Sequence, residues 1–118
     1  MLKFLFGNQA RVRIGNKLSD LEADFSPVNG YTGRGEVEFS AWKDGSRQLE
    51  VELRGIAGRS ADIYVNNMRV KSVTLTEGRG DEFFDTRQGD AIPDIREGTI
   101  VEVYQNGQPI LSAVMKHD

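Results

Sequence analysis

Short runs of alternating apolar and polar residues, separated by glycine, asparagine or proline, fill the chain from Gly35 onward. Successive side chains of a strand point to opposite faces, so a period of two with turn residues between runs is typical of antiparallel hairpins. In "GEVEFSAW" and "RQLEVEL" the apolar positions of one face are Val37, Phe39, Ala41, Leu49, Val51 and Leu53. The pattern predicts seven strands between Gly35 and Met115, one or two more before Gly30, and little helix.

The pairing of the first hairpin follows from the constant sum of residue numbers between antiparallel partners. Setting Phe39 opposite Leu49 leaves residues 43–45 as a three-residue loop. The third position of such a loop is left-handed, a conformation that glycine adopts without steric cost, and Gly45 occupies it.

A second hairpin turns at "NN", residues 66–67, because both asparagines tolerate the positive φ of a type I′ turn. We predict that Ile63 pairs with Val70 and Val65 with Met68. After the turn, the core-facing residues have even numbers up to Val70 and odd numbers from Val73. This change predicts a β-bulge near residues 71–72.

A final hairpin turns at "NG", residues 106–107, and places Pro109 opposite Tyr104. Proline donates no hydrogen bond to a ladder, so this end is expected at a sheet edge or in a non-bonded pair. The strand at residues 109–115 carries few outward charges, and it is the edge through which we expect association with another chain.

The tripeptide Arg79-Gly80-Asp81 is one that adhesive ligands display at loop tips. Pairing Leu75 with Phe83 puts residues 78–80 at the tip of a further hairpin, with Gly80 in the left-handed position. The glycines then have a backbone role, and we interpret the tripeptide as part of a turn.

Two segments do not follow the hairpin pattern. Residues 87–99 suit a connection that crosses between two sheets, anchored by Ile92 and Ile95. Residues 1–30 are the least regular: "RVRI" at 11–14 resembles a strand, and "SDLEADF" at 19–25 fits a short capped helix. The whole pattern predicts an all-β fold, an antiparallel β-sandwich or partly open barrel of about 8 strands joined mainly by hairpins, in a single domain spanning 1–118.

Composition is that of a globular domain, with 118 residues, 38% of them hydrophobic and 28% charged. The net charge of −3 and pI near 5.2 argue against nucleic acid as an obligatory partner, because phosphate-binding surfaces are basic. The opening apolar run, Leu2 and residues 4–6, is too short for a signal peptide or a membrane span. We therefore expect no membrane association and a cytoplasmic location, unless a preceding segment has been removed.

The residues of common catalytic sites are missing from the sequence. It has no cysteine, so thiolate nucleophiles and zinc–sulfur sites are excluded. Its one histidine, His117, lies next to the C-terminus, and a catalytic triad or a histidine metal site would need more than this. Phosphate-loop, dinucleotide and nucleophile-elbow motifs do not occur, and Asp85, Asp90 and Asp94 lack calcium-loop spacing. We expect a protein that is not an enzyme.

The most unusual feature is a concentration of carboxylates on the outer face of the first hairpin. The predicted register sets Glu38 opposite Glu50 and Glu36 opposite Glu52, and like charges across a ladder destabilise it. A register with Ser40 opposite Glu50 keeps the same four carboxylates on one face.

Three interpretations of this four-glutamate face stay open. Neighbouring cations, Arg54, Arg69 or Lys71, neutralise it; or it binds Ca²⁺ weakly, the only cofactor we consider, since Ca²⁺ takes hard oxygen ligands; or it docks a basic partner. A glycosidase pair of carboxylates would need a cleft and a raised pKa, which a flat ribbon does not supply.

Trp42, the only tryptophan, lies at the end of the same strand and on its polar face by parity. Exposed aromatic rings on β-sandwiches stack on sugars, and Tyr31, Tyr64 and Tyr104 could extend such a platform. A tryptophan that caps the end of the core is the simpler interpretation. The alternative function is therefore carbohydrate binding, or a metal-assisted carbohydrate-active hydrolase that uses the acidic face near Trp42.

The segment "GRGEVEF…LEVELRGIAG" resembles the opening strands of chordin-type domains, whose sandwich is similar to copper–zinc superoxide dismutase. The segment "ADIYVNNMRVKSVTL…DTRQGDAIPDIREGTIVEVYQNGQPILSA" resembles uncharacterised bacterial β-sandwich modules. The metal-binding histidines of the dismutases have no counterpart, because His117 lies beyond the last strand. The resemblance implies a sandwich with a non-catalytic structural or interaction role, so we expect a binding or assembly module that takes a protein partner or self-associates through an edge strand.

Overall fold

The computed structural model describes residues 16–118, and this part of the chain is built of antiparallel strands. The strands are β1 (Lys17–Pro27), β2 (Arg34–Trp42), β3 (Arg47–Arg54), β4 (Ser60–Val65), β5 (Met68–Thr74), β6 (Arg79–Asp85), β7 (Ile100–Gln105), β8 (Gln108–Val114) and β9 (Lys116–His117). A 3-10 turn, η2 (Thr86–Gln88), follows β6. The predicted all-β antiparallel fold is confirmed.

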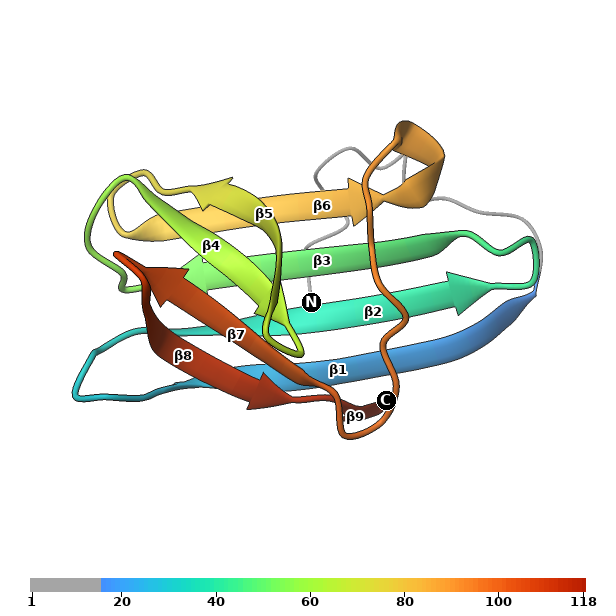
Figure 1. Cartoon of the computed structure of the whole chain (residues 1–118), viewed down its shortest axis with the longest axis horizontal. Helices are drawn as coiled ribbons and strands as arrows, with labels where there is room; N and C mark the ends of the chain where they lie inside the picture. Colours follow the sequence, from blue (N-terminus) through green and yellow to red (C-terminus); the bar gives the residue numbers. More distant parts are fainter. Residues whose placement is uncertain (1–15) are drawn as a thin grey trace.

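The strands form a barrel that is nearly closed. Their order is β5-β4-β7-β8-β1-β2-β3-β6, and β9 adds to β1. Figure 1 shows β6, β3, β2 and β1 side by side in one layer, crossed at an angle by β4, β7 and β8. β1 joins the layers because it pairs with β2 along most of its length and with β8 through Ser26 and Pro27. In the described residues, the terminal strands β5 and β6 form no ladder with each other, and an isolated bridge joins Thr76, just after β5, to Arg79 of β6.

The core lies between the two layers and contains the side chains that the alternation predicted. Phe39, Val51 and Ile63 are each 0% exposed. Residues 89–99 cross from β6 to β7, and buried Ile92 and Ile95 anchor them as expected. Burial of the apolar faces of strands such as β2, β3 and β4 selects this register, since a slip of one residue would turn those faces to solvent.

The first and last hairpins match the predictions. Phe39 pairs with Leu49, and Gly45 has a φ of 88° in the three-residue loop. Tyr104 pairs with Pro109 beside the turn at residues 106–107, where both φ values are positive.

The β4–β5 hairpin has its bulge earlier than predicted. Val65 pairs with Met68 as expected, but Ile63 pairs with Lys71 rather than with Val70. The extra residue at position 70 shifts the parity, so that Val73 becomes fully buried opposite Ala61. The free energy gained by burying Val73 is therefore larger than the cost of interrupting the ladder near the hairpin tip.

The hairpin between β5 and β6 differs more from the prediction. Its turn is Glu77-Gly78, with φ values of 54° and 80°, and the Leu75–Phe83 pairing is wrong. Gly80 is an extended, buried residue opposite Leu53 and not a left-handed loop residue. The Arg79-Gly80-Asp81 tripeptide therefore lies on a strand and not at a loop tip, so interpreting it as part of a turn was also wrong.

Two further predictions need correction. β8 lies between β7 and β1, so residues 109–115 are not a sheet edge. Residues 19–25 belong to strand β1, so the capped helix is wrong, and "RVRI" at 11–14 lies outside the described residues. Within residues 16–118, none of the helical structure is long and apolar enough to cross a membrane.

Candidate functional site

The four-glutamate face exists in the predicted register and is wider than predicted. Glu36 pairs with Glu52 and Glu38 with Glu50. The neighbouring strands continue both rows with more carboxylates, which belong to Asp24, Glu22 and Asp81. The outer face of β1, β2, β3 and β6 is thus an acidic surface spanning four strands.

Part of this charge is balanced within the face. Arg54 Nη1 lies 3.1 Å from Asp81 Oδ1, and its Nη2 lies 3.7 Å from Glu52 Oε2. The expected contribution of Arg69 and Lys71 is wrong, because they belong to β5 in the other layer. Arg54 therefore compensates the charge at Glu52 and Asp81, which is the part of this face where the neutralisation by a neighbouring cation is found as expected.

Glu22, in the same acidic surface, has an altered acidity. Partial burial raises the pKa of the Glu22 carboxyl, and a hydrogen bond to Asp118 and the nearby charges of Glu38 and Glu36 raise it further. The charged form of Glu22 is therefore disfavoured in the folded protein.

The acidic surface does not have the arrangement of a metal site. Among residues 16–118, no group of three or more histidine, aspartate or glutamate side chains converges as metal ligands would. Ca²⁺ needs six to eight oxygen ligands around one point, and carboxylates spread over a sheet face do not converge in this way.

The expected aromatic platform is divided among three places. The Trp42 ring lies under Lys17, whose Nζ is 5.2 Å from the ring centroid. Tyr64 and Tyr104 stack on each other on β4 and β7, with centroids 4.0 Å apart, and the Tyr31 hydroxyl donates to Gln108 Oε1. A sugar ring needs a shared free aromatic face, which these residues do not provide together.

The aspartates near the long connection have structural roles. Asp85 Oδ1 accepts the N–H of Arg87 and so caps η2. Asp90 accepts both the N–H of Asp85 at 2.8 Å and the ammonium of Lys71 at 2.6 Å. These contacts hold the start of the connection against the edge of β6.

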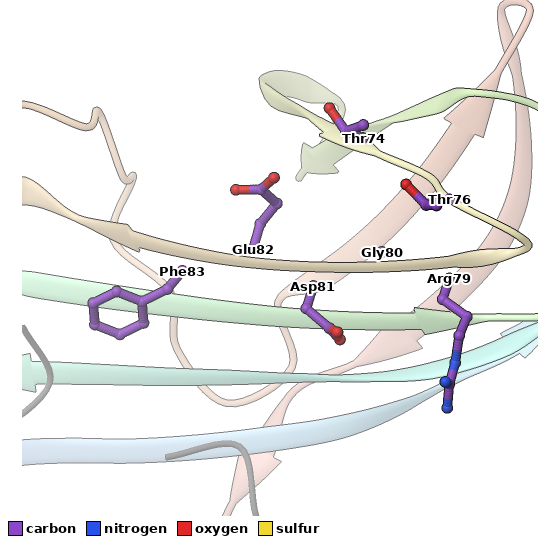
Figure 2. Close-up of a pocket in the computed structure, with 7 residues that line it drawn as sticks. All are labelled: Thr74, Thr76, Arg79, Gly80, Asp81, Glu82 and Phe83. Carbon is purple, nitrogen blue, oxygen red and sulfur yellow. The ribbon is translucent and has the colours of Figure 1, made fainter. Parts of the chain in front are cut away.

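A groove that sequence reasoning missed lies where β5 and β6 diverge. It has a volume of about 490 Å³ and is lined by Thr74, Thr76, Arg79, Gly80, Asp81, Glu82 and Phe83 (Figure 2). No sequence motif marks it, because it arises from the failure of the first and last strands of the sheet to pair. It is the opening of the nearly closed barrel.

The main chain of β6 faces this groove at alternate residues. The N–H and C=O of Arg79 bond to Thr76, and those of Asp85 bond to Asp90, so both point away from β3. Peptide groups of alternate residues point to the same side of a strand. The N–H and C=O of Asp81 therefore face the groove as well, and in the described residues β6 pairs along its length with β3 only.

The opposite wall of the groove is the β5 edge, and Glu82 of β6 lies near it. Leu75 donates its N–H to Arg59 on the β4 side, so the N–H of Thr74 points toward β6. The Thr74 N–H lowers the pKa of the Glu82 carboxyl, against the larger opposite effect of burial, so this carboxylate lies near the β5 edge. The side chain of Glu82 thus occupies part of the opening where a ladder hydrogen bond would close a complete barrel.

Neither a protein-family model nor a curated protein matches this chain. The geometry of residues 16–118 is therefore the basis for the functional proposal.

Proposed function

We propose that this protein is a non-catalytic binding module that takes up an extended segment of a protein partner in the groove between β5 and β6. The observation that carries the proposal is the edge of β6, where the main-chain groups of Asp81 face a groove of about 490 Å³. The non-catalytic interaction role implied by the resemblance to superoxide-dismutase-like sandwiches agrees with it.

Strand addition suits this groove for two reasons. Sheet edges with unsatisfied main-chain groups bind extended peptides through ladder hydrogen bonds, and the side-chain pockets beside them give specificity. The volume is within the usual range of ligand sites. An added strand would extend the ladder from β6 toward β5.

The charges on β6 favour a different chain over a second copy of this one. Two β6 strands pairing antiparallel about Asp81 or about Glu82 would bring identical carboxylates directly opposite each other. Like charges in such pairs destabilise a ladder, and an inward-pointing charge on an edge strand is a known protection against self-pairing. The partner is therefore expected to be a heterologous segment.

The test uses an acetylated and amidated heptapeptide, Thr-Val-Thr-Gln-Thr-Val-Thr, which is extended, uncharged and alternating. Backbone amide NMR of the protein is recorded during its titration. The proposal predicts that shifts are confined to residues 74–76 and 79–83 and saturate at millimolar peptide or below. Shifts spread evenly over the surface, or none, would contradict it.

Two variants separate the main chain from the side chain at the edge. Asp81→Pro removes the N–H that faces the groove without removing a bond to β3, so the protein is expected to fold while its affinity falls about threefold to tenfold. Asp81→Asn keeps the N–H and the side-chain size and is expected to bind as the parent does. Equal binding by both variants, with unchanged spectra elsewhere, would reject strand addition at β6.

A further inference from the structure

We propose that the groove selects an extended segment carrying a lysine or arginine whose cation pairs with the carboxylate of Glu82. This inference rests on the proposed strand addition and names the chemistry of the partner. It assigns Glu82 as a specificity-determining residue.

The position of Glu82 differs from that of the other charged residues of β6. Glu82 pairs with Val51, which is 0% exposed, so its side chain leaves β6 on the core side. Figure 2 shows Glu82 directed toward β5, whereas Asp81 and Arg79 project from the opposite face of the strand. Glu82 is therefore the acidic side chain that reaches from β6 into the opening between the strands.

The charge of Glu82 is incompletely compensated by its neighbours. Burial raises the pKa of the Glu82 carboxyl, and this outweighs the opposite effects of Lys71 and of the Thr74 N–H. Lys71 is engaged elsewhere, since its Nζ lies 2.6 Å from Asp90 Oδ1. Asp90 and Asp81 both add unfavourable negative charge. A further cation beside Glu82 would therefore stabilise its ionised form.

An added strand would bring such a cation to the right side. A strand paired with β6 has alternate side chains on the core side, and directly opposite Cβ atoms lie about 4.5–5.5 Å apart. A lysine or arginine opposite Glu82 can place its charged group on the carboxylate while its aliphatic stem packs in the groove. Its flanking residues at the same spacing would be apolar, since they face the edge of the core.

The experiment compares three heptapeptides, Thr-Val-Thr-Xaa-Thr-Val-Thr, with lysine, glutamine or glutamate at the central position. The parent protein is expected to bind the lysine peptide about threefold to tenfold more tightly than the glutamine peptide, and the glutamate peptide more weakly than either. The preference is expected to weaken as the pH falls through the pKa of Glu82, which lies above its ordinary value of 4.5.

Two variants assign the preference to one carboxylate. Glu82→Gln keeps the size and polarity of the side chain and removes its charge, so the groove is retained, and the lysine preference should disappear. Asp81→Asn removes a carboxylate from the outer face of the same strand and should leave the preference intact. A lysine preference that survives in Glu82→Gln would overturn the assignment.

The outcomes also separate this inference from the proposed function. If the three peptides bind equally at residues 79–83, strand addition stands and the selection by Glu82 is wrong. If none of them binds there, the proposed function itself is wrong.

Discussion

A Cβ atom on Gly80 of β6 would lie 2.8 Å from the carbonyl oxygen of Thr74 on β5. The same atom would lie 2.7 Å from Cγ1 of Val73, which is fully buried. The two strands therefore approach each other at Gly80 more closely than any side chain allows, directly beside the groove. The absence of a side chain at position 80 sets how far the barrel closes before β5 and β6 diverge.

Replacing Gly80 should force this contact apart. We expect Gly80→Ala to lower the free energy of unfolding by about 1–3 kcal/mol, because the obstructing atoms include main chain that cannot rotate away. Urea denaturation followed by circular dichroism measures the change. Asp81→Ala, next to it on the exposed face, is the control and should cost less than 1 kcal/mol. An unchanged midpoint for Gly80→Ala would show that the strands separate without strain.

The core between the layers should be sensitive to truncation. Phe39 is 0% exposed, so Phe39→Ala is expected to cost about 3–5 kcal/mol through lost apolar burial and the cavity left behind. Leu18 is 64% exposed, and Leu18→Ala should change stability by less than about 0.5 kcal/mol. Thermal and urea unfolding measure the stability of both variants. Similar losses of stability in Phe39→Ala and Leu18→Ala would mean that Phe39 is not in the core.

The acidity of Glu22 predicts a pH-dependent stability. Its pKa is raised in the folded state, so the folded protein holds that proton more tightly, and stability falls as the pH rises above about 4.5. Glu22→Gln should therefore be more stable than the parent at pH 7, with the difference shrinking toward pH 4. Glu77→Gln at an exposed turn is the control. Identical pH profiles for the parent and Glu22→Gln would contradict the raised pKa of Glu22 in the folded protein.

Asp90 should contribute stability in the opposite pH direction. Although burial raises its pKa, the hydrogen bonds from Lys71 and from the Asp85 N–H outweigh this and lower it. The stabilisation is present above the ordinary pKa of 3.8 and is lost as the pH falls through the lower, folded value.

Removing the charge of Asp90 tests this contribution. Asp90→Asn is expected to cost about 1–3 kcal/mol at pH 7, since charge-assisted bonds to a partly buried carboxylate are lost. Asp94→Asn removes an exposed pair with Arg96 and should cost less than 1 kcal/mol. Equal effects of the two substitutions in urea denaturation would refute the special role of Asp90.

The local sequence pattern was sufficient to predict the hairpins whose pairing and turn depend only on their own residues. The alternation around Phe39 and Leu49 predicted the register of β2 and β3, and with it the four-glutamate face, because a one-residue slip would expose the core side chains. Asparagine and glycine at residues 106–107 predicted the last turn, since positive φ is inexpensive for them. These features depend on residues that are close in the chain.

Errors arose where distant elements compete for the same residue. Gly80 was assigned to a turn, but the approach of Thr74 requires a glycine within the strand, and local sequence cannot show that approach. Residues 109–115 were assigned to a sheet edge, but β1, which is distant in the sequence, pairs with β8 on the side away from β7.

By itself, then, the sequence determined the class of the fold, the pairing of β2 with β3, of β4 with β5 and of β7 with β8, and the negative charge of the outer face. These features follow from side-chain alternation and turn chemistry. Tertiary structure decided which strands end the sheet, how nearly β5 and β6 meet, and that Glu82 points into the opening between them. Those properties depend on how all the strands twist and pack around one core, which is a sum over contacts far apart in the chain.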